Sequence, residues 1–342
     1  MLILGLGALL VLALVLPFSV RRIEEELELF FLSLGILAIS LQGGWTWALA
    51  GEALREPLPI TAAVLCAGLI FRVARLKLGA WARTGQRILG PRLLAFGLVL
   101  GLGVLSSLIT SVVAALVLSE VASSLKLPKP AEIRLVILGC FSIGAGSVLS
   151  PLGGPLAAIA IGRLQGDPYH AGFFFLTRLL GPWVLPLMLL FGILAAIFVH
   201  GNAKRPGLTE DGPETWRELI FRTLKIYGFV AGLVLFGQAF EPLAAQFLGL
   251  VPSLMLYWIN VLSAVLDNAT LTAIEMGPQL SPDRIRALLL GLLLAGGMLV
   301  PGNLPNIVCA SKLRLSSGDW ARFALPLGLA TMLLVFGALI FS

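Results

Sequence analysis

The chain has 342 residues, of which 58% are hydrophobic and 12% are charged, whereas an average soluble domain has about 25% charged residues. Apolar stretches of about 20 residues, each long enough to cross the hydrocarbon core of a bilayer, recur along its whole length. The composition therefore excludes a soluble protein and predicts an all-α, multi-pass protein of the cytoplasmic membrane. The net charge of +6 does not indicate nucleic-acid binding, because the basic residues gather in short segments between apolar runs.

Ten apolar runs follow one another along the chain. We expect the first to be a retained transmembrane helix, because no basic residue precedes it and Arg21 and Arg22 follow it directly. The first two runs form N-terminal transmembrane helices at 1–56, outside the repeats described below. The runs are 1–20, 28–50, 57–77, 93–125, 134–164, 169–199, 218–249, 250–277, 284–313 and 320–341.

The run 93–125 predicts a re-entrant hairpin rather than a crossing helix. As one straight helix it would be about 48 Å long, much more than a bilayer requires, and Ser106, Thr110 and Ser111 lie near its middle. Basic residues stand on both flanks, so both ends are expected in the cytoplasm. The run 250–277 has weakly charged flanks, which predicts a second hairpin that enters from the outside.

The two halves of the chain show an inverted-repeat pattern. The segment 105–111 in the first hairpin aligns with 262–268 in the second, and each hairpin continues through small and apolar residues to a glutamate, Glu120 or Glu275. The free-energy cost of an ionised acid is small near the membrane surface, so we expect both glutamates to be solvated at the interface. The pattern predicts two inverted-topology repeats joined by a cytoplasmic linker, with the boundaries 57–200, 201–217 and 218–342.

Asp267 is the strongest candidate for a functional residue. It lies deep in an apolar stretch, where an ionised aspartate costs about 2.5 to 3.5 kcal/mol. Ser263, Asn268 and Thr270 flank it in sequence with oxygen ligands and no opposing charge, and hard cations such as Na+ prefer such oxygens. We therefore expect a site for a cation and a proton. The alternative is that Asp267 caps a helix or pairs with Arg178.

Two proline-rich segments predict interruptions in transmembrane helices. Pro301 and Pro305 remove backbone donors, and the carbonyls left free, together with Asn303 and Asn306, offer oxygens to a cation. Unwound backbone at membrane depth is tolerated only where it is buried in protein or lines a wet cavity. The first half has a counterpart, which close packing through small residues would also explain. Its members are Pro151, Pro155, Ser147, Ser150 and Gly153.

Signatures of enzymes and of transition-metal sites are missing from the sequence. It contains no zinc-protease, serine-hydrolase or P-loop motif. Cys66, Cys140 and Cys309 lie far apart without CxxC spacing, which argues against a disulfide framework or a zinc site and predicts a packing role. We therefore expect neither an enzyme nor a bound cofactor.

The candidate residues resemble those of a known group of transporters. The stretches 262–272 and 296–306, the second of which contains Gly296-Gly297 and runs from Pro301 to Asn306, are similar to the ion transporter superfamily. That group includes NhaD-type sodium/proton antiporters, arsenite permeases and sodium-coupled dicarboxylate transporters. Within it, the chain most resembles an uncharacterised branch of cation transporters. The resemblance covers about residues 57–342 in architecture, and its specific motifs are these two stretches.

The resemblance implies a re-entrant hairpin and a broken helix in each repeat, an elevator-type movement and a homodimer. By position it also implies two ion sites. The second site comprises Asp267, Asn268, Asn303 and Asn306, and the first-repeat counterpart comprises Thr110, Ser111, Ser150 and Gly153 together with the neighbouring Ser106 and Ser147. Many relatives carry Asn or Asp where this chain has Thr110 and Ser111.

The leading hypothesis is a secondary active transporter that exchanges a monovalent cation, Na+, for H+. Asp267 would hold Na+ in its ionised form and return protonated, with Asn268 and Asn303 as further ligands. The alternative is sodium-coupled transport of a small anion, for which Arg178 is the main candidate residue because it lies within an apolar run. A third class, a membrane scaffold or receptor, would show no ion-dependent behaviour.

Overall fold

The computed structural model describes residues 2–20, 22–23, 26–199, 215–248, 251–266 and 268–341. These residues are helical wherever they are regular, and no strand occurs among them. Five helical segments are long and apolar enough to cross a membrane, which confirms the predicted all-helical membrane protein. They are Thr84–Leu105, Lys129–Ser147, Phe175–Phe198, Trp216–Phe240 and Ser317–Ile340.

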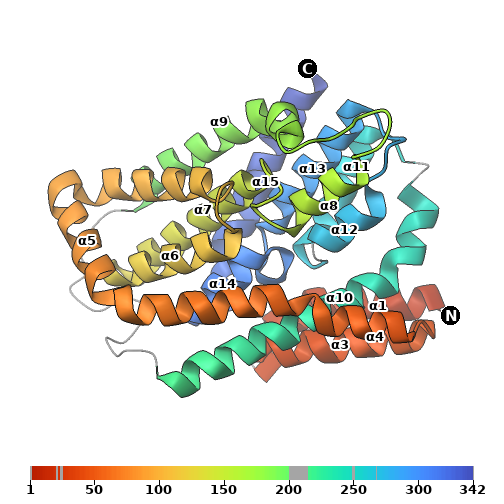
Figure 1. Cartoon of the computed structure of the whole chain (residues 1–342), viewed down its shortest axis with the longest axis horizontal. Coiled ribbons are helices and arrows are strands. Elements are labelled where there is room, and N and C mark those ends of the chain that lie inside the picture. Colours follow the sequence, from red (N-terminus) through yellow and green to blue (C-terminus); the bar gives the residue numbers. More distant parts are fainter. Residues whose placement is uncertain are drawn as a thin grey trace.

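The N-terminal helices pack against the middle of the chain. They are α1 (Leu2–Ser19), α3 (Leu27–Gln42) and α4 (Trp47–Arg55). The predicted single run 28–50 is divided, because Gly43 adopts a left-handed conformation with φ of 71° and ends α3. α3 runs along α10 (Trp216–Leu248), and these helices lie together at the N-terminal side of the molecule (Figure 1).

The helix α5 (Pro57–Leu105) is much longer than the sequence predicts. The runs 57–77 and 93–125 were expected to be separate, but the basic segment between them is also helical. It contains the good helix formers Leu, Ala, Arg and Gln. A kink at Gly90, with φ of 74°, precedes Pro91, so α5 bends at one end of the molecule and doubles back (Figure 1).

A short turn at 106–110 joins α5 to α6 (Ser111–Ser124), and the two helices pack together. The next transmembrane helix is interrupted: α7 (Lys129–Ser147) ends, and the chain restarts as α8 (Pro155–Arg163). α9 (Phe175–Phe198) then packs against both α5 and α7.

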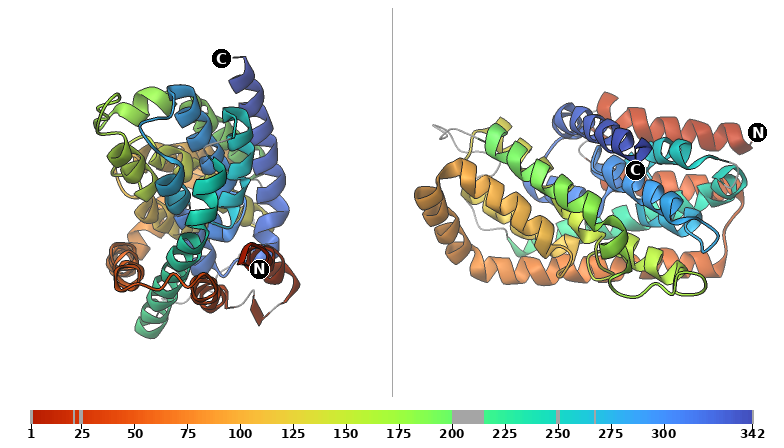
Figure 2. Two further views of the ribbon diagram at one scale, coloured as in Figure 1. Left: turned by 90° about the vertical axis from the view of Figure 1, so that its right-hand side faces the viewer. Right: turned by 90° about the horizontal axis from the view of Figure 1, so that it is seen from above.

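The second half of the chain follows α10. It comprises α11 (Ser253–Ile259), the 3-10 helix η1 (Asn260–Ala264), α12 (Asn268–Glu275), α13 (Pro282–Gly296), the 3-10 helix η2 (Val300–Gly302), α14 (Leu304–Leu313) and α15 (Ser317–Ile340). Two views show α1 beside α15 on one side of the molecule and α5 along the opposite edge (Figure 2).

The two halves cross over each other at the centre. α6, from the first half, packs against α14, whereas α8 packs against α12 from the second half. Thus α14, which follows the interruption in the second half, packs against α6, which follows the turn in the first half. In the same way, α8 packs against α12 (Figure 1). The predicted linker 201–217 lies outside the described residues except for its last three positions.

Candidate functional site

Asp267, the strongest candidate in the sequence, lies outside the residues that the structure describes, whereas Leu266 and Asn268 on either side of it are described. The site must therefore be built from the groups around that position. We call the meeting of η1, the start of α12 and the α13–α14 interruption the second junction. Its members are Ser263, Asn268, Gly296, Gly302 and Asn306.

Asn268, at the start of α12, holds the second junction together. Its side chain is 4% exposed, and its amide nitrogen faces the Leu292 carbonyl at 3.1 Å, Ser263 Oγ at 2.9 Å and the Gly302 carbonyl at 3.2 Å. The Ser263 hydroxyl itself donates to the same Leu292 carbonyl at 2.9 Å. α12 and η1 are therefore fixed to α13 and to the interruption by shared polar contacts.

Asn306 lies two residues into α14 and is fully buried. Its Nδ2 donates to the carbonyl of Gly296, the last residue of α13, at 2.8 Å and to the carbonyl of Leu299 in the interruption at 2.9 Å. Its Oδ1 has no hydrogen-bond partner among the described residues. The second junction thus contains a buried amide oxygen that is free to accept from a ligand.

Gly296 is required by the close approach of Asn268. A Cβ atom at this position would overlap the Asn268 amide. The side chain of Asn268 can reach the interruption only because residue 296 lacks a side chain. The sequence reveals this glycine, but not its partner.

Two other predicted ligands lie apart from these contacts. Thr270 packs against Gly237 of α10, on a different side of α12 from Asn268, because two residues correspond to about 200° of rotation along a helix. Asn303 is half-buried, and its Nδ2 lies 2.7 Å from the place that a Cβ on Gly144 of α7 would occupy. Asn303 therefore faces the first half rather than Asn268.

The first-repeat counterpart is a hydrogen-bonded joint between the 106–110 turn and the α7–α8 interruption. The Ser111 amide donates to the Gly153 carbonyl at 2.8 Å, and the Ser150 hydroxyl donates to the Ser107 carbonyl. Ser106 Oγ lies 2.9 Å from the Ile143 carbonyl. The structure thus brings the predicted first-half residues together, but their polar groups contact the backbone.

The remaining members of this counterpart have local roles. Thr110 is exposed and caps α6 by accepting from the Val113 amide at 3.3 Å. Ser147 donates to the Gly144 carbonyl of its own helix at 2.8 Å. The first-half hydroxyls contact backbone groups, whereas the second half offers two buried amide side chains, one of which has an oxygen without a partner among the described residues. The second junction is therefore the better candidate for a cation site.

The four prolines lie at the interruptions. Pro151 lies in the turn between α7 and α8, and Pro155 is the first residue of α8. Pro301 is the middle residue of η2, and Pro305 is the second residue of α14. Proline is tolerated in the first turn of a helix, where no helical acceptor exists for its missing N–H, so Pro155 and Pro305 start new helices rather than kink existing ones.

The expectation that Glu120 and Glu275 are solvated was wrong. Both are buried, with 6% and 8% of their surface exposed. Glu120 Oε2 pairs with Lys312 Nζ at 2.8 Å, because α14 packs against α6. The signal in the sequence was Lys312 in the last turn of its helix, but nothing local identified an acid 192 residues away as its partner.

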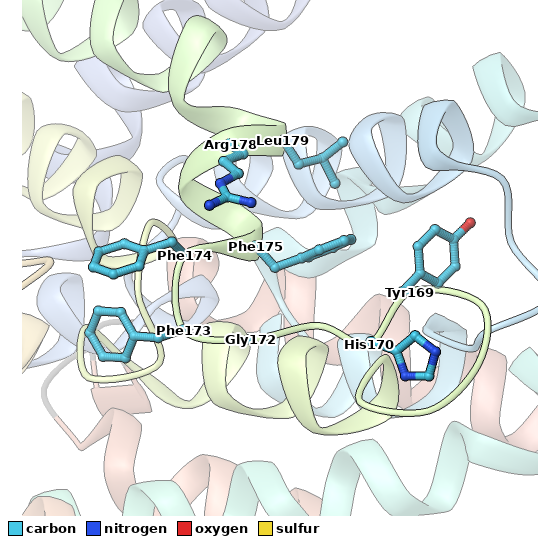
Figure 3. A pocket seen from close by; sticks show the side chains of 8 residues that line it. All are labelled: Tyr169, His170, Gly172, Phe173, Phe174, Phe175, Arg178 and Leu179. Carbon is cyan, nitrogen blue, oxygen red and sulfur yellow. The ribbon is translucent and has the colours of Figure 1, made fainter.

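Arg178 lies at the surface, although its apolar surroundings in sequence suggested a deeper position. It is exposed in the first turn of α9 and lines an open pocket of about 620 Å³. No ion pair joins it to an acid in the described part of the chain. Figure 3 shows that Phe173, Phe174 and Phe175 surround it, with Tyr169 and His170 at the far end.

Two buried cysteines from different halves approach each other. The Cys140 thiol of α7 contacts that of Cys309 in α14, and both are reduced. The two cysteines lie far apart in the sequence, and no local pattern predicted this contact. Across the described residues, no group of three or more His, Cys, Asp or Glu side chains could hold a metal ion.

Comparison with known proteins places almost the whole chain in one family. A family model described as "Protein of unknown function (DUF1646)" matches residues 3–342. No curated protein matches the chain.

Proposed function

The chain belongs to the DUF1646 family, and we propose that it is a secondary active ion transporter that exchanges Na+ for H+ across the cytoplasmic membrane. The observation that carries this proposal is the second junction, where buried oxygens gather at an interruption between two apolar helices. The proposal includes Asp267 as the charged ligand, because it directly precedes Asn268.

The chemistry of the second junction supports a hard monovalent cation. Asn306 contributes a buried oxygen without a partner among the described residues, and Ser263 and Asn268 lie within 3 Å of each other beside it. Hard cations take carboxylate, amide, hydroxyl and carbonyl oxygens. One carboxylate among neutral oxygens matches the charge of one Na+.

The crossed packing supports the inverted repeats and the re-entrant hairpins in this proposal. In each half a turn leads into a helix, which is α6 in the first half and α12 in the second. α6 packs against α14, which follows the interruption of the second half, and α12 packs against α8, which follows the interruption of the first half. An inverted repeat produces such reciprocal contacts through a pseudo-two-fold axis in the membrane plane. The elevator-type movement and the homodimer rest on the resemblance to the ion transporter superfamily.

In the proposed cycle, Na+ and H+ compete for the second junction. Asp267 is ionised while it holds Na+ and protonated when the cation leaves, so that the charge of the buried site stays balanced in both states. Either form can cross between the two sides.

Flux measurements in proteoliposomes with an internal pH dye test the proposal. An outward Na+ gradient should acidify the lumen, since each Na+ that leaves is replaced by a proton. The Asp267→Asn variant should lose this response, and the exposed Glu52→Gln control in α4 should keep it. An unchanged response in Asp267→Asn would contradict the assigned site.

A second candidate, sodium-coupled transport of an anion, is favoured by one observation. Arg178 is an exposed cation at the N-terminal end of α9, beside an open pocket, and both its charge and the helix dipole attract anions. In the same liposomes, this alternative requires Na+ uptake that depends on an added anion and continues without a pH change.

A further inference from the structure

Glu275 is a buried carboxylate at the end of α12. Its carboxyl group lies beside the Asn260 side chain, and its Oε2 is buried without a partner among the described residues. A buried ionised carboxylate is costly unless a positive group is close. Glu275 therefore requires a proton or a cation.

Asn260 adds a second acceptor to this place. It is 1% exposed, its Nδ2 donates to the Leu288 carbonyl at 3.2 Å, and its Oδ1 is buried without a partner in the described part of the chain. Asn260 Oδ1 and Glu275 Oε2 are thus two neighbouring buried acceptors, and the described residues offer neither of them a hydrogen-bond donor. A proton on the carboxyl group would supply that donor.

The charged groups that the structure describes on the surrounding helices form no ion pair with Glu275. α12 packs against α8, α10 and α13. Arg286 pairs with Asp283 at 2.9 Å, Arg284 donates to the Val251 carbonyl at 2.7 Å, and Arg163 is exposed at the end of α8. In the other arm of the turn, Tyr257 donates to the Met332 carbonyl.

α10 meets α12 at Gly237 and Thr270. Its described titratable side chains all precede that contact by ten or more residues, and the side chain of Glu241 is outside the described ones. The described titratable side chains of α10 are Arg217, Glu218, Arg222, Lys225 and Tyr227. No described cation therefore forms an ion pair with Glu275.

Buried polar groups connect Glu275 to the second junction. Asn260 and Ser263 lie three residues apart on η1, on the same side of a 3-10 helix. They donate to the carbonyls of Leu288 and Leu292, which lie one turn apart on α13. Asn268 also faces the Leu292 carbonyl and Ser263, so a continuous row of buried polar groups runs from Asn260 to the second junction.

We propose that Glu275, supported by Asn260, is a proton site separate from the cation site at the second junction. The inference rests on the proposed function and replaces competition at one carboxylate with coupling between two. The carboxylic acid of Glu275 releases its proton to water when Na+ binds, and it takes a proton again when Na+ leaves. One positive charge is thus exchanged for another.

Electrostatics provides the coupling between the two sites. Residues 268 and 275 are about 10 Å apart along α12 at 1.5 Å per residue. At that distance and an effective dielectric constant of about 20, a bound unit charge changes the proton affinity of a carboxylate by about tenfold. Binding of Na+ at one end of α12 therefore favours release of the proton at the other end.

Proton release on Na+ binding tests the separate site. Na+ is added to the purified full-length protein in weakly buffered detergent solution, and the pH change and the Na+-dependent thermal shift are recorded together. The wild type and the Glu52→Gln control should release protons and be stabilised. Glu275→Gln should release at least fivefold fewer protons and keep its thermal shift.

The outcomes separate this inference from the proposed function. Full proton release by Glu275→Gln would overturn the separate site and leave exchange at Asp267 in place. A wild type without a Na+-dependent thermal shift would overturn the proposed function itself. If Glu275→Gln does not fold, a hydrophobic carbodiimide, which reacts with protonated carboxyl groups, is applied to the wild type. Mass spectrometry should then find Glu275 modified, and Na+ should protect it; an unmodified Glu275 contradicts the proposal.

Discussion

At the residue scale, Asn306 combines two roles in one side chain. Its nitrogen closes the end of α13 by donating to two carbonyls, while its oxygen is directed to no described group. Serine at this position could not donate twice, and aspartate could not donate at all when ionised. The amide is therefore suited to hold the interruption open and to present an acceptor.

The Asn306→Ala variant should lose Na+ affinity by at least about tenfold, because one ligand and two supporting hydrogen bonds, each worth about 1 kcal/mol, disappear together. The midpoint of the Na+-dependent thermal shift measures this change. Gln279→Ala removes an exposed amide from the loop before α13 and should have no effect. Equal midpoints in Asn306→Ala and wild type would remove Asn306 from the site.

At the element scale, the ion pair between Glu120 and Lys312 fixes α6 to α14. Only 8% and 13% of the two side chains are exposed. Removing one partner of a buried pair costs about 3 to 5 kcal/mol, because the other charge remains buried. Lys312→Met should therefore lower the midpoint of thermal unfolding strongly, and Glu120→Gln together with Lys312→Met should restore much of it. Additive losses in the double variant would show that the two charges do not interact.

The sequence predicted the elements better than their partners. Pro155 and Pro305 identify helix starts because proline restricts its own backbone, and the serines at 106 and 111 bracket the turn between α5 and α6. The burial of Glu120 and the contact between Cys140 and Cys309 depend on packing between segments far apart in sequence. Local patterns carry no information about such contacts.

Two predictions from the pattern of charges were wrong. The basic residues between 72 and 92 are typical of a loop, but their helix propensity is high and α5 passes through them. Arg178, judged by its apolar neighbours, was expected to be deep, but the first turn of α9 places it at the surface. For the candidate site, the sequence identified Ser263, Asn268 and Asn306 together, whereas the role of Glu275 depends on burial that only the fold reveals.

At the scale of the whole molecule, α9 separates two polar ends. The helix is about 36 Å long, and it begins just after the loop that contains Asp167. At its other end, the ring of Phe198 packs against that of Phe323 with 5.6 Å between the ring centroids. Arg322, next to Phe323, therefore lies about 36 Å from the loop that contains Asp167. Both side chains are exposed, 85% for Arg322 and 92% for Asp167. The two positions should lie on opposite sides of the membrane.

Labelling of single cysteines with an impermeant maleimide tests this topology, in a background where the three native cysteines are replaced by serine. Asp167→Cys should react in intact cells, and Arg322→Cys should react only after permeabilisation, since basic residues favour the cytoplasmic side. Reaction of both positions from the same side would contradict the crossing of α9.

The bend in α5 also has a mechanical consequence. Because no loop separates its two arms, the first arm, which packs against α10, continues directly into the second at Gly90. The second arm is a lever of 15 residues, or about 22 Å. A rotation of about 20° at that single residue would sweep the lever's tip, and the first-half joint attached to it, through about 8 Å, or roughly one and a half helical turns.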